Sequence, residues 1–162
     1  EIVKARAARP AGALPHGERT VLMAIAQHPN GVTREQLSVL TAYKRSSRDT
    51  YLQKLRAAEL VDSSGERILA TASGSAALGA DFEPLPTGAN LRAYWLERLP
   101  EGERKVLAII LDAYPQAIAR EDIDDQAGYK RSSRDTYLQK LRARELIIAD
   151  RHEVQASGML FA

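Results

Sequence analysis

The sequence predicts a mainly α-helical protein with small β-hairpins, built as two tandem copies of a unit of three helices followed by a hairpin. Three observations support this prediction. A segment of 18 residues occurs twice in the chain of 162. Apolar residues recur at helical spacing before and within each copy, and two short apolar runs with a polar turn between them follow each copy. The length suits two small domains.

The repeated segment covers residues 43–60, YKRSSRDTYLQKLRAAEL, and residues 129–146, YKRSSRDTYLQKLRAREL, so 17 of its 18 positions are identical. The 14 residues before each copy share only 3. Apolar positions differ between the copies, as Val32 and Ile118 show, whereas the polar positions of the repeated segment do not. A functional surface on this segment explains the contrast, and recent copying of the segment is the alternative.

In the first unit we expect helices at residues 18–27, 33–40 and 46–58, and a hairpin at residues 60–69. Thr33 and Gln36 form a capping-box pattern at the start of the second helix. We expect Ser46 or Ser47 to cap the third helix, and Ser46 with Asp49 fits the same kind of pattern.

The second unit repeats this order, with helices at residues 103–114, 120–126 and 132–144 and a shorter hairpin at residues 146–155. Before it, an amphipathic helix at residues 90–98 carries an apolar stripe that suits packing between domains or a dimer contact. The expected organisation is an N-terminal extension at 1–13, a first domain at 14–80, a linker with its helix at 81–98, and a second domain at 99–162.

Three helices followed by a hairpin is the element order of a winged helix-turn-helix. Residues 46–61, SSRDTYLQKLRAAELV, resemble the recognition helix and first wing strand of bacterial winged-helix regulators, and so does the second copy. Those regulators typically end the helix with Lys-Leu-x-x-x-Gly-Leu-Val/Ile. Here Glu59 and Glu145 replace the Gly, and Arg48 and Arg134 occupy a usually aliphatic position. The resemblance implies two tandem winged helix-turn-helix DNA-binding domains.

The charge of the chain is distributed unevenly. Residues 43–58 carry a net charge of +4 and residues 129–144 carry +5, in a chain whose formal net charge is only +2. The remainder therefore carries −7. Two basic patches in an otherwise acidic chain are the electrostatic pattern of a nucleic-acid-binding protein.

The third helix of each unit is expected to have two different faces. With about 100° of rotation per residue, Leu52 and Leu55 fall on one side, and Thr50, Gln53 and Lys54 fall on the other. The second face has no bulky apolar side chain and no acid, so it can enter the major groove of DNA. Gln53 has the amide geometry that recognises adenine, and Lys54 suits guanine or phosphate.

The predicted DNA-binding residues surround this helix and extend to the hairpin. In the first unit they are Tyr43, Lys44, Arg45, Ser46, Ser47, Thr50, Gln53, Lys54 and Arg67. In the second unit they are Tyr129, Lys130, Arg131, Ser132, Ser133, Thr136, Gln139, Lys140 and Arg151. The serines and the helix N-terminus offer donors to phosphate, and the hairpin arginines suit a minor groove or phosphates.

Several of these residues have a purely structural alternative. Ser46 and Ser47 serve equally as helix caps, and Tyr43 suits core packing as well as a phosphate contact. We expect the guanidinium of Arg48 to pair with Glu35, and that of Arg134 with the matching Glu121. An acidic run on the second helix of the second unit is interpreted as solvated surface; it comprises Asp122, Asp124 and Asp125.

The composition argues against other functional classes. With no cysteine in the chain, disulfides and thiolate metal sites are excluded, and the histidines lack metal-ligand spacing. We find no phosphate-binding glycine loop and no catalytic constellation, so we expect no cofactor, no metal and no enzyme activity. Apolar runs are too short for a membrane span, and the expected location is the cytoplasm, at the nucleoid.

The leading expectation is a sequence-specific double-stranded DNA-binding protein, acting as a transcriptional regulator on two similar half-sites. One alternative is the DNA-targeting region of a larger ATPase, nuclease or recombination protein, since the chain opens on Glu1 rather than Met. Another is a tandem winged-helix scaffold for protein partners. A homodimer is compatible with each of these.

Overall fold

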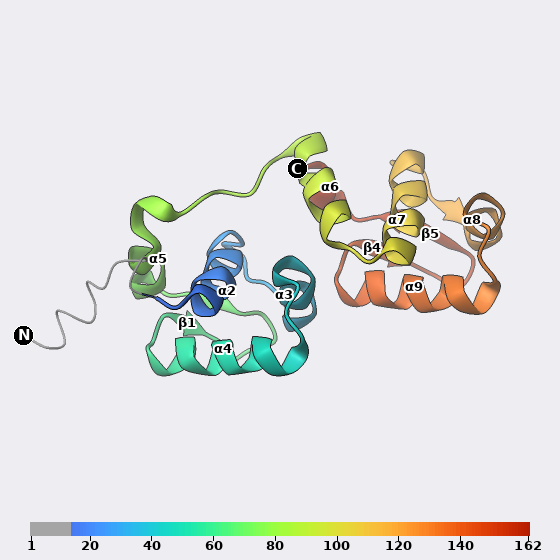
Figure 1. Cartoon of the computed structure of the whole chain (residues 1–162). Coiled ribbons are helices and arrows are strands. Elements are labelled where there is room, and N and C mark those ends of the chain that lie inside the picture. The colour runs from blue at the N-terminus through green and yellow to red at the C-terminus, as the bar shows by residue number, and fades with distance from the viewer. Residues whose placement is uncertain (1–13) are drawn as a thin grey trace, which may run out of the picture. The chain divides into compact units, whose positions relative to one another are not determined.

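The computed structural model describes residues 14–162, which form a mainly helical fold with two small antiparallel sheets (Figure 1). This described part contains eight α-helices. It divides into two compact units, with the boundary between Leu85 and Pro86. No helix within residues 14–162 is long and apolar enough to cross a membrane. The extension predicted at residues 1–13 lies outside the described residues.

The first unit contains three helices, a hairpin and a further short helix. These elements are α2 (His16–Ala26), α3 (Arg34–Thr41), α4 (Arg45–Ala57), β1 (Val61–Asp62), β2 (Leu69–Ala70), α5 (Ala72–Leu78) and the 3-10 turn η2 (Gly79–Asp81). Their core includes Leu22, Ile25, Leu37 and Leu55, which are almost fully buried. Because these apolar residues recur at helical spacing, each helix buries one face against the others.

The start of α3 follows the prediction, but the start of α4 does not. The Thr33 side chain accepts a hydrogen bond from the Gln36 N–H, and the Gln36 side chain accepts one from the Thr33 N–H, so the predicted capping box is confirmed. The predicted serine cap of α4 is wrong. This helix begins at Arg45, with Lys44 as its N-cap residue and no capping side chain among residues 14–162. Ser46 therefore lies inside the first turn.

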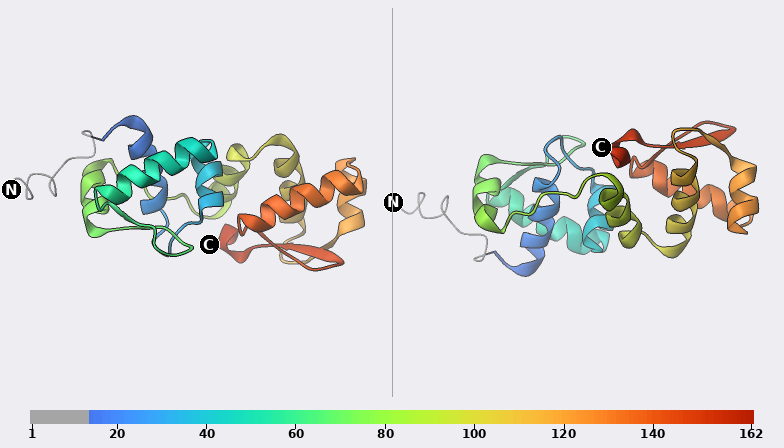
Figure 2. Two further views of the ribbon diagram at one scale, coloured as in Figure 1. Left: turned by 90° about the horizontal axis from the view of Figure 1, so that it is seen from below. Right: turned by 90° about the horizontal axis from the view of Figure 1, so that it is seen from above.

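The hairpin of the first unit joins β1 to β2, with Val61 opposite Ala70 and Asp62 opposite Leu69. A separate β-bridge links Ile68 to Val32, just before α3, through two backbone hydrogen bonds of 3.0 and 2.8 Å. The hairpin is thus attached both to the end of α4 and to the start of α3. In Figure 2 it lies alongside α4.

The second unit repeats this arrangement after an additional helix. Its elements are α6 (Gly88–Arg98), α7 (Glu101–Ala113), β3 (Ile118–Ala119), α8 (Arg120–Ala127), α9 (Arg131–Ala143), β4 (Ile147–Ala149), β5 (Glu153–Ala156) and the 3-10 turn η3 (Gly158–Phe161). The strands form one sheet in the order β3-β5-β4. The hairpin was predicted to be the shorter of the two; its turn is shorter, but its strands are longer than β1 and β2.

The helix expected as a linker helix is α6, and it packs within the second unit. It contacts α7 and η3 and buries Leu91 and Trp95. At its C-terminal end Leu99 is also buried. The apolar stripe therefore contributes to the core of the second unit, and a role in dimer contacts stays a prediction.

Candidate nucleic-acid interface

The solvent-facing side of α4 is a ridge of small and polar side chains. Ser46, Thr50, Gln53 and Ala57 follow the spacing of one helix face and are all exposed. On the opposite side of the helix Leu52 and Leu55 are buried. The two-faced helix predicted from the sequence is therefore present. We call Ser46, Thr50, Gln53, Ala57 and the adjacent Lys54 the outward face of α4.

Cationic side chains border this outward face. Lys44, Arg45 and Lys54 are exposed, and the Arg45 side chain is 88% accessible. Arg56, in the last turn, is exposed as well and was missed by the sequence analysis, as was the matching Arg142. Their position in the last turn of a basic helix was the available signal. The cations give the outward face a positive rim.

The second unit presents the same face on α9. Its outward face consists of Ser132, Thr136, Gln139, Lys140 and Ala143, all of which are exposed. The exposed or buried state of each residue matches that of its counterpart in α4. Two copies of one polar, cation-bordered helix face are thus displayed by one chain.

The first turns of α4 and α9 have no side-chain hydrogen-bond acceptor for their N–H groups among residues 14–162. The hydroxyl of Thr50 donates to the backbone oxygen of Ser46 at 2.9 Å, and that of Thr136 donates to Ser132 at 3.0 Å. The open N–H groups of a first turn and the positive end of the helix dipole favour an anion such as phosphate.

A buried arginine attaches α4 to α3. The Arg48 side chain is only 4% exposed. It donates to the backbone oxygen of Arg34 at 2.9 Å, to the Ser38 hydroxyl at 2.8 Å and to the Asp49 carboxylate at 2.9 Å. The expected pairing of Arg48 with Glu35 is therefore wrong. Ser38 lies one turn further along α3, on the side that packs against α4.

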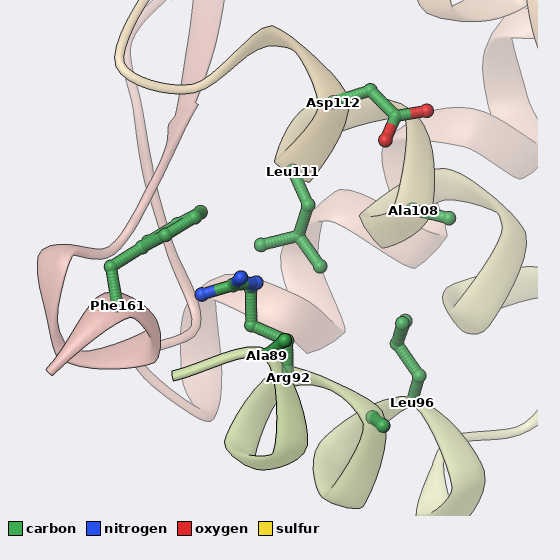
Figure 3. Close-up of a pocket in the computed structure, with 8 residues that line it drawn as sticks. Ala89, Arg92, Leu96, Ala108, Leu111, Asp112 and Phe161 are labelled. Carbon is green, nitrogen blue, oxygen red and sulfur yellow. The ribbon is translucent and has the colours of Figure 1, made fainter. Parts of the chain in front are cut away.

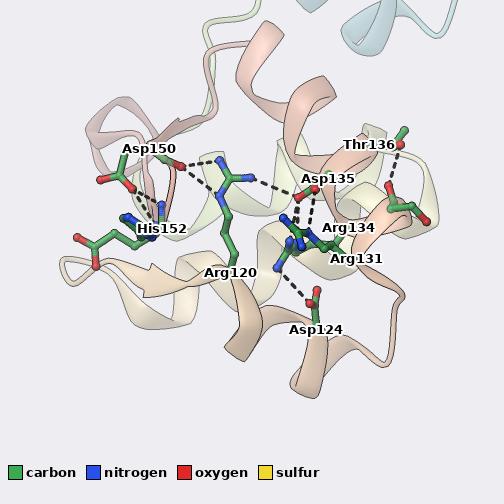
Figure 4. Close-up of polar contacts among 10 residues, drawn as sticks. Arg120, Asp124, Arg131, Arg134, Asp135, Thr136, Asp150 and His152 are labelled. Atoms are coloured by element: carbon green, nitrogen blue, oxygen red, sulfur yellow. Dashed lines mark hydrogen bonds and ion pairs between the residues drawn. The ribbon is translucent and has the colours of Figure 1, made fainter.

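In the second unit the matching Arg134 is held by charged partners (Figure 4). It donates to the Asp124 carboxylate at 3.1 Å and to the Asp135 carboxylate at 3.0 Å. The expected pairing with Glu121 is wrong for the same reason. Asp124, interpreted from the sequence as solvated surface, is a half-buried partner of Arg134. It occupies the position of Ser38 in the repeat.

The second helices of both units begin with an arginine, Arg34 in α3 and Arg120 in α8, and this arginine attaches the hairpin turn to the helix. Arg120 donates to the backbone oxygen of Asp150 at 2.6 and 3.1 Å and to Asp135 at 3.3 Å (Figure 4). In the first unit Arg34 donates to the backbone oxygen of Ser63 at 3.5 Å. This contact explains why the arginine occurs in both copies although most residues of the second helices differ.

In each hairpin an aspartate at or just after the end of the first strand organises the backbone of the turn. The Asp150 carboxylate accepts hydrogen bonds from the N–H groups of Glu153 and His152, and these bonds lower the pKa of Asp150. In the first unit the hydroxyl and N–H of Ser64 likewise lower the pKa of Asp62. Both carboxylates are therefore charged and hold their turns at neutral pH.

A pair of tyrosines packs between α4 and α2 in the first unit, and the matching pair packs between α9 and α7 in the second. The rings of Tyr43 and Tyr51 pack at 5.1 Å between centroids, and those of Tyr129 and Tyr137 at 5.2 Å. The Tyr51 ring covers Gly17 so closely that an added Cβ there would collide with it. The packing alternative for Tyr43 is thus present. The same contact joins Tyr137 to Gly102, which explains why the sequences LPHGER and LPEGER, where α2 and α7 begin, share their glycine.

The predicted hairpin arginines are exposed and lie outside α4 and α9 in the sequence. The stem of Arg67 lies over Gly31, where an added Cβ would be 2.8 Å from the arginine Cβ. Arg151 is exposed in the turn between β4 and β5. The remaining predicted residues are brought together on α4 and α9 and the turns before them.

A glutamate beside each helix distinguishes the two units. In the first unit the carboxylate of Glu18, in α2, lies 3.9 Å from the ammonium of Lys54, which belongs to the outward face of α4. In the second unit Glu103 of α7 is 2% exposed and pairs with Arg144. Arg144 replaces Ala58 and is the one difference within the repeated segment.

A groove in the second unit offers a different kind of surface (Figure 3). It has a volume of about 470 Å³ and is open to solvent. Its lining comes from α6, α7 and η3: Ala89, Arg92, Ala93, Leu96, Ala108, Leu111, Asp112 and Phe161. Arg92 stacks over the Phe161 ring at 4.3 Å, which partly fills one end. No residue of α9 lines this groove.

A scan against protein-family models, a search of curated proteins and a search of solved structures each gave no match. Function is therefore inferred from the geometry and charge of the two units.

Proposed function

We propose that the chain consists of two tandem winged helix-turn-helix domains that bind double-stranded DNA through the outward faces of α4 and α9. The observation that carries this proposal is the repetition of one exposed, polar, cation-bordered helix face. Core packing explains Leu52 and Leu55, but it gives no reason to keep Gln53 and Lys54 in both copies. In this interpretation α3 and α4 form the helix-turn-helix, and the β1–β2 hairpin is the wing.

The outward faces have the chemistry of major-groove recognition. The ridge of Ser46, Thr50, Gln53 and Ala57 is narrow enough for a groove about 12 Å wide, and Gln53 can contact adenine with two hydrogen bonds. Lys44, Arg45 and the first-turn N–H groups can hold phosphates and so fix the orientation of the helix. The second unit repeats each contact, so the target is two similar half-sites.

We further propose that the protein acts as a transcriptional regulator at the nucleoid, since sequence-specific recognition of two half-sites is the usual chemistry of such proteins. A DNA-targeting role within a larger ATPase, nuclease or recombination protein uses the same two faces. Pairing of two copies of the chain would extend the number of half-sites to four.

A protein-interaction scaffold is the second candidate, and the groove between α6 and α7 is the observation that favours it. The outward faces themselves are poor protein-binding surfaces because they lack the buried aromatic or aliphatic anchors of interaction hot spots. A scaffold function would therefore depend on the groove and not on Gln53 or Lys54.

The test is binding of the full chain to genomic DNA fragments and to a mixed-sequence duplex, by gel shift and fluorescence anisotropy. Replacing Gln53, Lys54, Gln139 and Lys140 by Ala should weaken binding by about a hundredfold or more, because four groove contacts are lost. Binding should also fall steeply with salt, with a log–log slope of about −6 to −9.

The matched control is Arg92→Ala with Arg98→Ala, which removes two cations from α6. This control should change affinity by no more than about threefold, because these cations contribute only to the long-range field. Circular dichroism must show that both variants are folded. Unchanged affinity of the quadruple variant, or equal losses in the two variants, would contradict the proposal.

A further inference from the structure

The two outward faces are identical in sequence, but their lysines are held differently. In the first unit the ammonium of Lys54 lies 3.9 Å from Glu18, so part of its charge is compensated within the protein. In the second unit, among residues 14–162, no carboxylate lies within 4.0 Å of the Lys140 ammonium. Both lysines are exposed, so each can contact a ligand.

The difference between the lysines accompanies the single mismatch in the repeated segment. Glu18 and Glu103 occupy the same position of the repeat, in LPHGER and LPEGER. Arg144 pairs with Glu103, which is 2% exposed, and so occupies the carboxylate that would otherwise face Lys140. Ala58 has no charged group, so it cannot pair with Glu18, and Glu18 lies within ion-pair distance of Lys54 instead.

Resting on the proposed DNA-binding function, we infer that the residue after the recognition helix, Ala58 or Arg144, sets how strongly the lysine of that helix binds DNA phosphate or guanine. Arg144 neutralises Glu103 and leaves Lys140 fully available. In the first unit a DNA contact by Lys54 competes with Glu18, whose charge also repels phosphate. The second unit is therefore the stronger DNA-binding unit, and residues 58 and 144 are positioning residues.

The backbone permits a direct exchange of these residues. Ala58 has φ and ψ of −85° and 2°, and Arg144 has −90° and 4°, so Arg fits at position 58 without strain. Ala58 is exposed. The variant Ala58→Arg should therefore reproduce in the first unit the pairing that the second unit already has.

The experiment measures the affinity of the full chain for a mixed-sequence DNA duplex in a set of lysine variants. Lys140→Ala should weaken binding about two- to fivefold more than Lys54→Ala, the range set by one exposed ion pair. In the Ala58→Arg background the cost of Lys54→Ala should rise to that of Lys140→Ala. In the Glu18→Gln background it should rise as well, without any added cation.

Ala58→Gln is the control, because it lengthens the side chain without charge and should leave the cost of Lys54→Ala unchanged. Equal costs of Lys54→Ala and Lys140→Ala in every background would overturn the inference while leaving DNA binding in place. Absence of duplex binding by the unmodified chain would overturn the proposed function together with this inference.

Discussion

The two units present the same helix face but support it with different interactions. In the first unit Arg48 is held by a hydroxyl, a backbone oxygen and one aspartate, whereas in the second unit Arg134 is held by two carboxylates. A capping box begins α3, whereas α8 has no side-chain cap within the described residues. The turn before α4 uses Ala42, and the turn before α9 uses Gly128.

This difference teaches which features the helix face requires. Supporting contacts can be exchanged, a neutral one for a charged one, provided that the helix keeps its position. The side chains of the outward face have not been exchanged in either copy. Under the proposed DNA-binding function, the constraint on the repeated segment acts at its exposed surface as well as at its packed side.

The largest predicted difference between the units concerns the buried arginines. Arg134→Ala should destabilise the second unit by about 3 kcal/mol, because it leaves the half-buried Asp124 without its partner. Arg48→Ala should cost the first unit only about 1 to 2 kcal/mol, since Ser38 is neutral. Urea denaturation measures both, with the fluorescence of the single tryptophan, Trp95, reporting on the second unit and circular dichroism on all helices.

Asp124→Ser, which copies the first unit, is the control for this comparison. In the Asp124→Ser background the cost of Arg134→Ala should fall to that of Arg48→Ala. Equal costs of the two arginine substitutions in the unmodified chain would show that the charged and neutral supports are equivalent.

A smaller difference is expected at the turns that precede α4 and α9. Ala42 has a φ of 61° and Gly128 a φ of 75°, both in the left-handed region that disfavours a Cβ. An added Cβ at Gly128 would meet no atom within 4 Å, so Gly128→Ala tests the backbone alone. It should lower stability by about 1 kcal/mol, and Ala42→Gly should raise it by about 0.5 to 1 kcal/mol. A gain in stability for Gly128→Ala would contradict the left-handed assignment.

The smallest effect is a pH dependence confined to the first unit. Burial lowers the pKa of His28 below its usual value of 6.5, although its hydrogen bond to the Ala24 oxygen opposes this shift. Folding therefore favours the neutral form of His28. Above pH 6.5 the histidine is neutral in both states and the folded state keeps its full stability. As the pH falls from 6.5 through the lower pKa of the folded state, the unfolded state takes up the proton first and stability is lost.

We therefore expect the urea midpoint followed by circular dichroism, which reports on both units, to fall between pH 7.5 and 5, while the midpoint followed by Trp95 fluorescence changes less. His28→Gln should reduce this dependence because the titrating group is removed. The same loss of stability with pH in the His28→Gln variant would show that another group is responsible.

The helices other than α5, the two hairpins and the outward face could be predicted from the sequence because they depend on local patterns, whereas α5 and the short strand β3 were not predicted. Apolar spacing located the helices, and Thr33 with Gln36 identified a capping box that the structure confirms. The outward face followed from the helical period once Leu52 and Leu55 were assigned to the core. These features need no knowledge of how the helices cross.

The partners of the buried arginines could not be predicted, because they depend on the packing register between helices. Glu35 was a reasonable partner for Arg48 by charge, but the crossing of α3 and α4 places Ser38 there. The pairing of Arg144 with Glu103 likewise joins residues far apart in sequence. The sequence held one signal for these partners. Ser38 aligns with Asp124 in the repeat, and both are polar residues that can accept a hydrogen bond from the arginine.

The central claim is that the outward faces of α4 and α9 bind duplex DNA, and NMR tests it most directly. Backbone amide shifts of the labelled chain are followed while a mixed-sequence duplex is added. We predict the largest changes at residues 44–57 and 130–143, with larger changes in the second range at low DNA concentration. Changes confined to the groove between α6 and α7, or no change at either helix, would contradict the claim.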